Sequence, residues 1–76
     1  MYYIYKERRL IGSSSSIDYV VEFTKLMIDR AIDTEKGSIK LKQLYEYKLT
    51  VNSPKVGINQ LQHILARLEY SLEVDI

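Results

Sequence analysis

The segment 17–33 carries apolar side chains at the spacing of an α-helix. Its apolar positions are Ile17, Val20, Val21, Leu26, Met27, Ile28, Ala31 and Ile32, with Tyr19 and Phe23 beside them. Apolar residues that recur every three or four positions indicate an amphipathic helix. An apolar surface wider than one narrow face should contact two neighbours, which are two elements of the same domain or one element and a second copy of the chain. We therefore predict a long helix, and we take Tyr19, Phe23 and Leu26 as the candidate interface of a homodimer.

Both ends of this helix have recognisable signals. A run of serines at 13–16 precedes it, and Ser15 with Asp18 three positions later forms a variant of the capping box. Gly37 follows the last apolar residue, and glycine is the usual residue for the left-handed conformation that ends a helix. The helix is therefore expected to begin after the serines and to stop before Gly37.

The chain has 76 residues and no cysteine, so a single hydrophobic core must stabilise it without disulfides or cysteine-bound zinc. We predict one domain over 1–76, with an N-terminal strand and a serine-rich linker in 1–16 and the core in 17–76. No apolar run reaches the roughly 18 residues of a membrane span, and charges interrupt the N-terminus where a signal peptide would be apolar. We expect a cytoplasmic protein that makes no contact with a membrane.

Short strands are expected at both ends of the chain. Tyr2, Tyr3, Ile4 and Tyr5 favour a pleated surface, and they predict one strand within 1–11. The tail 70–76 alternates apolar and polar residues, which is the clearest strand pattern in the sequence. Together with the helices, these strands predict an α+β fold.

The middle of the chain is less definite. The segment 41–49 alternates like a strand but also has helical spacing, and its Lys, Gln, Leu and Glu residues favour a helix. A short strand at 38–40 fits the same pattern. Ser53 and Pro54 form a good helix start, with serine as the cap and proline in the first turn. A third helix is therefore predicted from Pro54 to about Glu69, with Gly57 weakening its first turn.

This order of elements resembles the winged helix-turn-helix family of small DNA-binding proteins. The resemblance rests on Ile39, Leu41 and Leu44 before and in the shorter helix, on Leu49 and Val51 before the turn, and on the segment 53–68 as the next helix. It implies a small winged-helix-like domain with three helices and short terminal strands. It also implies that the helix after Pro54 enters the major groove, and that the segment 69–76 begins a wing or a sheet strand.

The residues of that helix give separate support for contact with DNA. If its leucines face the core, its outer face shows Lys55, Asn59, Gln60, Gln62, His63 and Arg67, none of which is acidic. Asparagine and glutamine can pair with adenine and arginine with guanine in the major groove, while lysine suits a phosphate. A solvated surface with no partner is the simpler interpretation of the same amides, and pattern alone does not separate the two.

The net charge is only +1, but the positive charges are clustered. The segment 37–56 has a net charge of +3, and the segment 1–16 has +2, while the long helix and the tail are acidic. We therefore place phosphate contacts at Lys40, Lys42, Lys48 and Lys55, and at Arg8 and Arg9.

The sequence offers no constellation for catalysis. His63 is the single histidine and has no cysteine to share a metal, and a structural or surface role is favoured for it. Asp29 and Asp33 are spaced along one helix face, where exposed carboxylates are common. We therefore expect no enzyme, no metal, no cofactor and no small-molecule substrate.

Two functions remain. The first is a sequence-selective protein that binds double-stranded DNA, works as a transcriptional regulator by docking, and forms a homodimer that reads two half-sites. The second is a protein-interaction module, a small inhibitor or adaptor. It would use the tyrosine-rich N-terminal strand for edge pairing or the long helix for packing.

Overall fold

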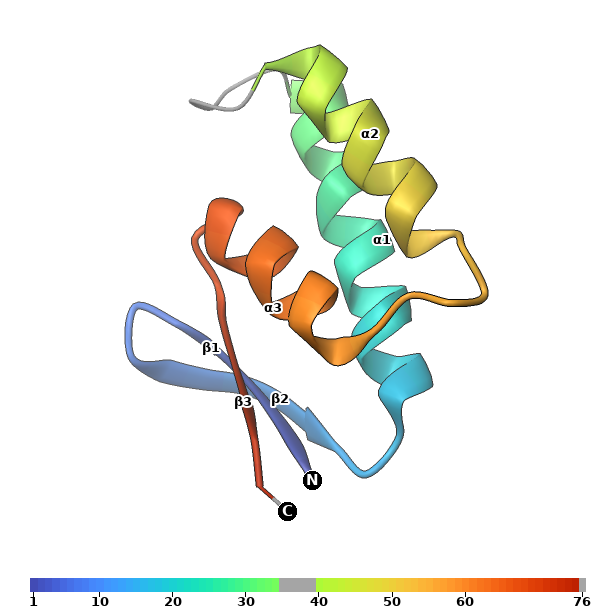
Figure 1. Cartoon of the computed structure of the whole chain (residues 1–76). Helices are drawn as coiled ribbons and strands as arrows, with labels where there is room; N and C mark the ends of the chain where they lie inside the picture. The colour runs from blue at the N-terminus through green and yellow to red at the C-terminus, as the bar shows by residue number, and fades with distance from the viewer. Residues whose placement is uncertain (35–39, 76) are drawn as a thin grey trace.

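The computed structural model describes residues 1–34 and 40–75, which form three strands and three helices (Figure 1). The elements follow the order β1 (Tyr2–Lys6), β2 (Arg9–Ser14), α1 (Ile17–Thr34), α2 (Leu41–Val51), α3 (Ile58–Arg67) and β3 (Ser71–Val74). This confirms an α+β domain with three helices and with strands at both ends of the chain. It also decides in favour of a helix over 41–49. Gly37 and most of the strand expected at 38–40 lie outside the described residues.

The N-terminal segment forms a hairpin, so the prediction of one strand followed by a linker was wrong. β1 and β2 pair antiparallel, with Lys6 opposite Arg9, and the serine run enters β2 up to Ser14. The two turn residues, Glu7 and Arg8, both have positive φ, at 52° and 66°. Two-residue hairpin turns of type I′ need positive φ at both positions, which Asn-Gly sequences adopt most readily.

β1 is the central strand of the sheet. The strand order is β2-β1-β3, and β1 pairs antiparallel with both neighbours. Edge pairing by the tyrosine-rich strand is therefore excluded, because both of its edges are already occupied. The first and last described residues also meet: the Met1 amino group donates to the Asp75 carbonyl (3.0 Å) and the Asp75 N–H donates to the Met1 carbonyl (2.9 Å).

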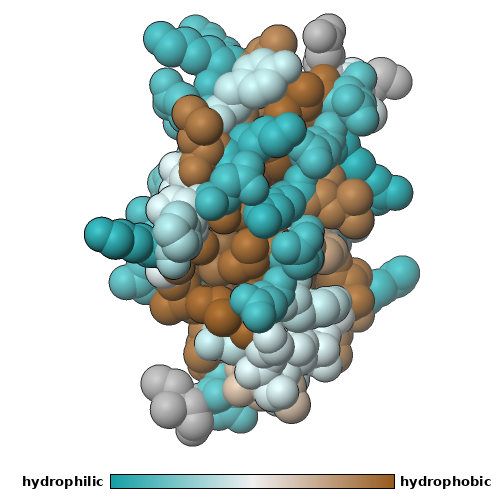
Figure 2. Space-filling model, turned by 90° about the vertical axis from the view of Figure 1, so that its right-hand side faces the viewer, coloured by the Kyte–Doolittle hydropathy of each residue, from teal (hydrophilic) through white to brown (hydrophobic). Residues whose placement is uncertain are grey.

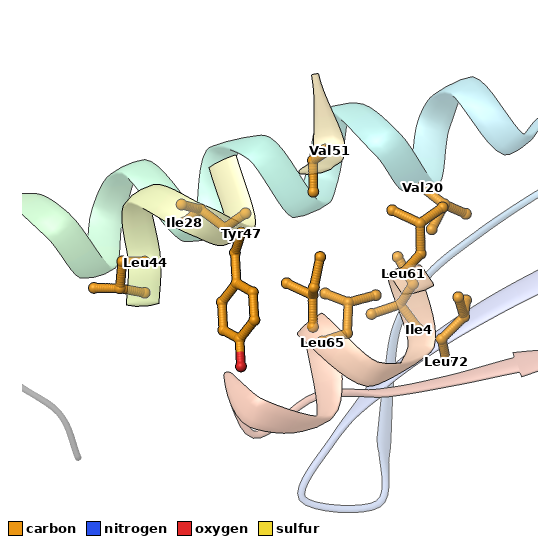
Figure 3. Close-up of a cluster of buried hydrophobic side chains, with 10 residues drawn as sticks. Ile4, Val20, Ile28, Leu44, Tyr47, Val51, Leu61, Leu65 and Leu72 are labelled. Carbon is orange, nitrogen blue, oxygen red and sulfur yellow. The ribbon is translucent and has the colours of Figure 1, made fainter. Parts of the chain in front are cut away.

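The helices lie on one side of the sheet. α3 packs on β3 and against α1, while α2 packs mainly along α1, farther from the strands (Figure 1). The core lies where these layers meet (Figure 3), and its members are Ile4, Val20, Ile28, Leu44, Tyr47, Val51, Leu61, Ile64, Leu65 and Leu72. Every helix and both β1 and β3 contribute to this single cluster.

Two serines hold the start of α1. The Ser16 hydroxyl accepts the Asp18 N–H (3.2 Å), and the Ser14 hydroxyl accepts the Ser16 N–H (3.0 Å). The expected capping residue, Ser15, is therefore wrong by one position. A serine oxygen satisfies a free N–H at the helix start, as predicted, but Ser16 provides it.

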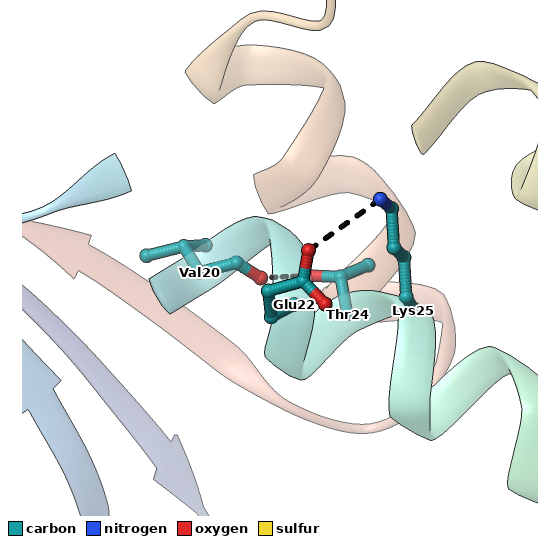
Figure 4. Close-up of polar contacts among 4 residues, drawn as sticks. All are labelled: Val20, Glu22, Thr24 and Lys25. Carbon is teal, nitrogen blue, oxygen red and sulfur yellow. Dashed lines mark hydrogen bonds and ion pairs between the residues drawn. The ribbon is translucent and has the colours of Figure 1, made fainter. Parts of the chain in front are cut away.

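Thr24 is the polar residue in the core. Its side chain is buried, and its hydroxyl donates to the Val20 carbonyl at 2.7 Å (Figure 4). A buried hydroxyl is costly without a partner, and this bond along the helix supplies one. On the same helix, the half-buried Lys25 and the exposed Glu22 form an ion pair at 3.5 Å (Figure 4), which adds little to stability because water reaches and screens it.

α3 begins four residues later than the sequence suggests. Ser53 and Pro54 form a turn, in which the Ser53 hydroxyl accepts the Lys55 N–H (3.3 Å) and the Ser53 carbonyl accepts the Val56 N–H (3.2 Å). Gly57 is the N-terminal cap, with extended backbone, and the Gln60 side-chain oxygen accepts its N–H at 2.8 Å. The Ser-Pro signal was therefore that of a turn, and Gly57 precedes the helix instead of weakening it.

α3 ends in a Schellman motif. The Tyr70 N–H donates to the Leu65 carbonyl (2.8 Å), and the Glu69 N–H donates to the Ala66 carbonyl (3.1 Å). Glu69 has a φ of 72°, in the left-handed region that glycine usually occupies at this position. A residue with a Cβ is strained in that conformation.

We expect the substitution Glu69→Gly to raise the free energy of unfolding by about 0.5–1 kcal/mol, because it removes this strain. Urea denaturation measures the change. Glu69→Ala is the matched control, because it removes the same charge near the helix end but keeps the Cβ. Equal stabilisation by both variants would assign the effect to charge and contradict the explanation by backbone strain.

Candidate nucleic-acid interface

The outer side of α3 carries exposed polar residues. Leu61, Ile64 and Leu65 face the core, so the opposite side of the helix presents Asn59, His63 and Arg67 at intervals of four residues. All three are exposed, and α3 contains no acidic residue. This arrangement agrees with the sequence prediction for these three residues.

The two glutamines of α3 are less available than expected. The Gln62 side-chain amide donates to the Leu72 carbonyl at 3.1 Å and is half-buried against β3, so its placement on the outer face was wrong. Gln60 is exposed, but its side-chain oxygen accepts the Gly57 N–H. Its NH₂ group remains available as a donor. The side-chain amide of Asn59, in contrast, makes no hydrogen bond within the described residues.

A groove separates α3 from α2. Its volume is about 270 Å³, and it is lined by Tyr47 and Thr50 from α2 and by Asn59, Gln60, His63 and Ile64 from α3. The Tyr47 and His63 rings meet edge to face, with centroids 6.3 Å apart and planes at 83°. This contact positions His63 between the groove and the outer face of α3. Tyr47 and Thr50 were not predicted as site residues, although helical spacing puts them one turn apart on α2.

The tip of the β1–β2 hairpin lies at the end of the sheet where α3 terminates. Tyr5 pairs with Ser71, the first residue of β3, so the turn at Glu7 and Arg8 comes next to the chain leaving α3 (Figure 1). The Lys6 ammonium lies 4.6 Å from the centroid of the Tyr70 ring, which ties the hairpin to this chain segment. Arg8 and Arg9 at this turn are exposed, and so is Arg67, the last residue of α3.

The four predicted lysines are dispersed. Lys48 forms an ion pair with Asp29 of α1 at 3.1 Å, which directs its side chain to the side of α2 away from α3. Lys40 and Lys42 are exposed at the start of α2, and Lys55 is exposed in the turn before α3. The structure therefore groups Asn59, Gln60 and His63 around the groove. Lys55 precedes α3 in the chain. The structure does not bring Lys48 to this face.

Two of the three predicted dimer residues are used within the chain. Tyr19 lies over β2, where a Cβ at Gly12 would overlap its hydroxyl. The Phe23 ring packs edge to face on Tyr70, with centroids 5.3 Å apart. Leu26 is the most exposed of the three, at 54%, and Tyr19 keeps 38% of its surface exposed. The wide apolar face of α1 is thus explained largely by neighbours in its own domain.

In residues 1–34 and 40–75, no group of three or more His, Asp or Glu side chains is arranged to hold a metal ion. Within the same residues, no helix is both long and apolar enough to cross a membrane. No family model, curated protein or solved structure matched this chain when it was compared with them.

Proposed function

We propose that the protein is a sequence-selective, double-stranded-DNA-binding protein that acts as a transcriptional regulator by docking α3 into the major groove. The observation that carries the proposal is the exposed face of α3, which presents Asn59, His63 and Arg67 and has no acidic residue on the helix. An α-helix fits the major groove, and amide and guanidinium groups can recognise base edges there.

Each side chain has a distinct role in this proposal. Asn59 pairs with adenine through both atoms of its amide, and Arg67 pairs with guanine. Gln60 contributes only its NH₂ group, since its oxygen holds the helix start. Lys55 and the free N–H groups at the start of α3 contact a phosphate.

The β1–β2 hairpin would act as the wing of a winged-helix-like domain. It precedes the helices in the chain, yet its pairing with β3 puts its tip at the end of α3. There Arg8 and Arg9 would contact the backbone beside the groove that Arg67 enters. Operators are commonly read as two half-sites, so the proposal includes a homodimer.

A protein-interaction module is the second candidate function. The near-neutral net charge and the exposed apolar side chains Leu41, Tyr45 and Leu49 of α2 favour it. Such an interface would depend little on ionic strength.

A salt titration with a duplex selected from a random library tests the proposal. Phosphate contacts by Lys55, Arg8 and Arg9 predict that the affinity of one protomer for a single half-site falls by about 40-fold between 50 and 200 mM salt, because binding releases counterions. Lys55→Gln should reduce the slope of log K against log salt by about one for each bound protomer, whereas the control Lys25→Gln on α1 should leave it unchanged. Failure to retard any duplex even at low salt would exclude the proposal.

A further inference from the structure

Three large apolar side chains form a stripe along the exposed side of α2. Leu41, Tyr45 and Leu49 follow each other at intervals of four residues and are 41%, 50% and 75% exposed. The buried side of the same helix is formed by Leu44, Tyr47 and Val51. A soluble helix normally presents polar residues on its outer side, so this apolar stripe, called the α2 stripe below, lacks a partner within the described chain.

Charged residues border the α2 stripe in an asymmetric way. Figure 2 views the molecule from the side where α1 and α2 lie and shows apolar surface interrupted by polar side chains. On the flank next to α1, Lys48 is already paired with Asp29. On the other flank, Lys42 and Glu46 are both exposed, and neither takes part in an ion pair within the described residues.

We propose that the α2 stripe is an interface between two copies of this chain, in which α2 packs antiparallel against α2 of the second copy. A twofold axis beside Tyr45 would bring Leu41 against Leu49 of the second copy, and the two Tyr45 rings against each other. Antiparallel pairing also reverses the charge pattern, so that Lys42 comes within reach of Glu46 of the second copy. The interface is thus self-complementary in shape and in charge, as a twofold interface requires.

The chemistry of the flank favours a second copy over an unrelated partner. Lys42 and Glu46 lie one helical turn apart. When a second copy of α2 runs antiparallel to the first, each of these two residues therefore faces the opposite charge on the other copy. A domain with a small core can also be stabilised by association. Because Tyr47 and Thr50 lie on the other side of α2, this dimer leaves the groove and the outer face of α3 open. It does not depend on whether α3 binds DNA.

Sedimentation equilibrium of the full chain tests the proposal. We expect the unmodified protein to be a dimer at about 100 μM and Leu49→Glu to raise the dissociation constant at least about tenfold, since a charge replaces a buried leucine. Leu10→Glu is the control, because Leu10 is 51% exposed on β2, an element that packs against β1 and α1. A monomeric unmodified protein would overturn the proposal. So would equal effects of the two variants, with circular dichroism confirming that both are folded.

Charge reversal identifies the partner as a second copy. Lys42→Glu and Glu46→Lys should each weaken the dimer, because each places like charges opposite one another, and the double variant should restore it. Leu26→Glu tests the competing interface on α1. The proposal is wrong if the double variant stays dissociated, or if Leu26→Glu dissociates the dimer and Leu49→Glu does not.

Discussion

The double variant Asn59→Ala, Arg67→Ala is expected to bind a selected duplex at least about 30-fold more weakly than the unmodified protein. Each bidentate contact to a base is worth roughly 1–3 kcal/mol, and both side chains lie on the exposed side of α3. Fluorescence anisotropy at constant salt, with the selected and a scrambled duplex, measures the loss of specificity. The free energy of unfolding should change by less than about 0.5 kcal/mol per site, because neither residue is buried.

The matched control for this experiment is the double variant Glu22→Ala, Lys25→Ala on α1. It also removes two polar side chains from a helix, but the helix is α1, and the two form an ion pair with each other. Its affinity for DNA should be unchanged. If the α3 double variant is folded and still binds with full affinity, the DNA-binding proposal fails and the protein-interaction module becomes the better hypothesis.

The substitution Leu61→Ala is expected to lower the free energy of unfolding by about 3 kcal/mol. Leu61 is completely buried where α3 meets the other layers (Figure 3), and a cavity left by a missing leucine side chain costs about 2–5 kcal/mol. Urea denaturation measures the difference from the unmodified protein. For a small domain this is a large part of the total stability.

Leu26→Ala is the control for Leu61→Ala. It makes the same chemical change at a position that is 54% exposed, and it should cost less than about 1 kcal/mol. Similar losses for the two variants would contradict the placement of Leu61 in the core and, with it, the orientation of α3.

The helices were predictable because their apolar spacing agrees with the packing they adopt. α1 extends over Ile17–Thr34, close to the predicted 17–33, and the segment 41–49 is helical. The hairpin could not be predicted in the same way. Its turn consists of Glu7 and Arg8, and neither residue carries the Asn or Gly signal of a turn with positive φ. Strand pairing therefore imposes a conformation that the local sequence does not favour.

In the candidate site, too, the features set by the local sequence were predictable, and those set by contacts between elements were not. The exposure of Asn59, His63 and Arg67 follows from their spacing opposite the buried leucines, and it was predicted. The engagement of Gln62 with β3 and of Lys48 with Asp29 depends on which elements lie beside α3 and α2. A pattern within one helix contains no information about such neighbours, so these two residues could not be placed from sequence.

The reciprocal bonds between Met1 and Asp75 have a consequence for the order of folding. They join residues 74 positions apart, and β3, which completes the sheet, is the last described element along the chain. The β1–β2 hairpin and the helices close over short distances along the chain, whereas this closure has a high entropic cost. During synthesis, β1 would thus have one unsatisfied edge until the final strand leaves the ribosome. A chain truncated before Ser71 would keep that edge open and would be prone to aggregate.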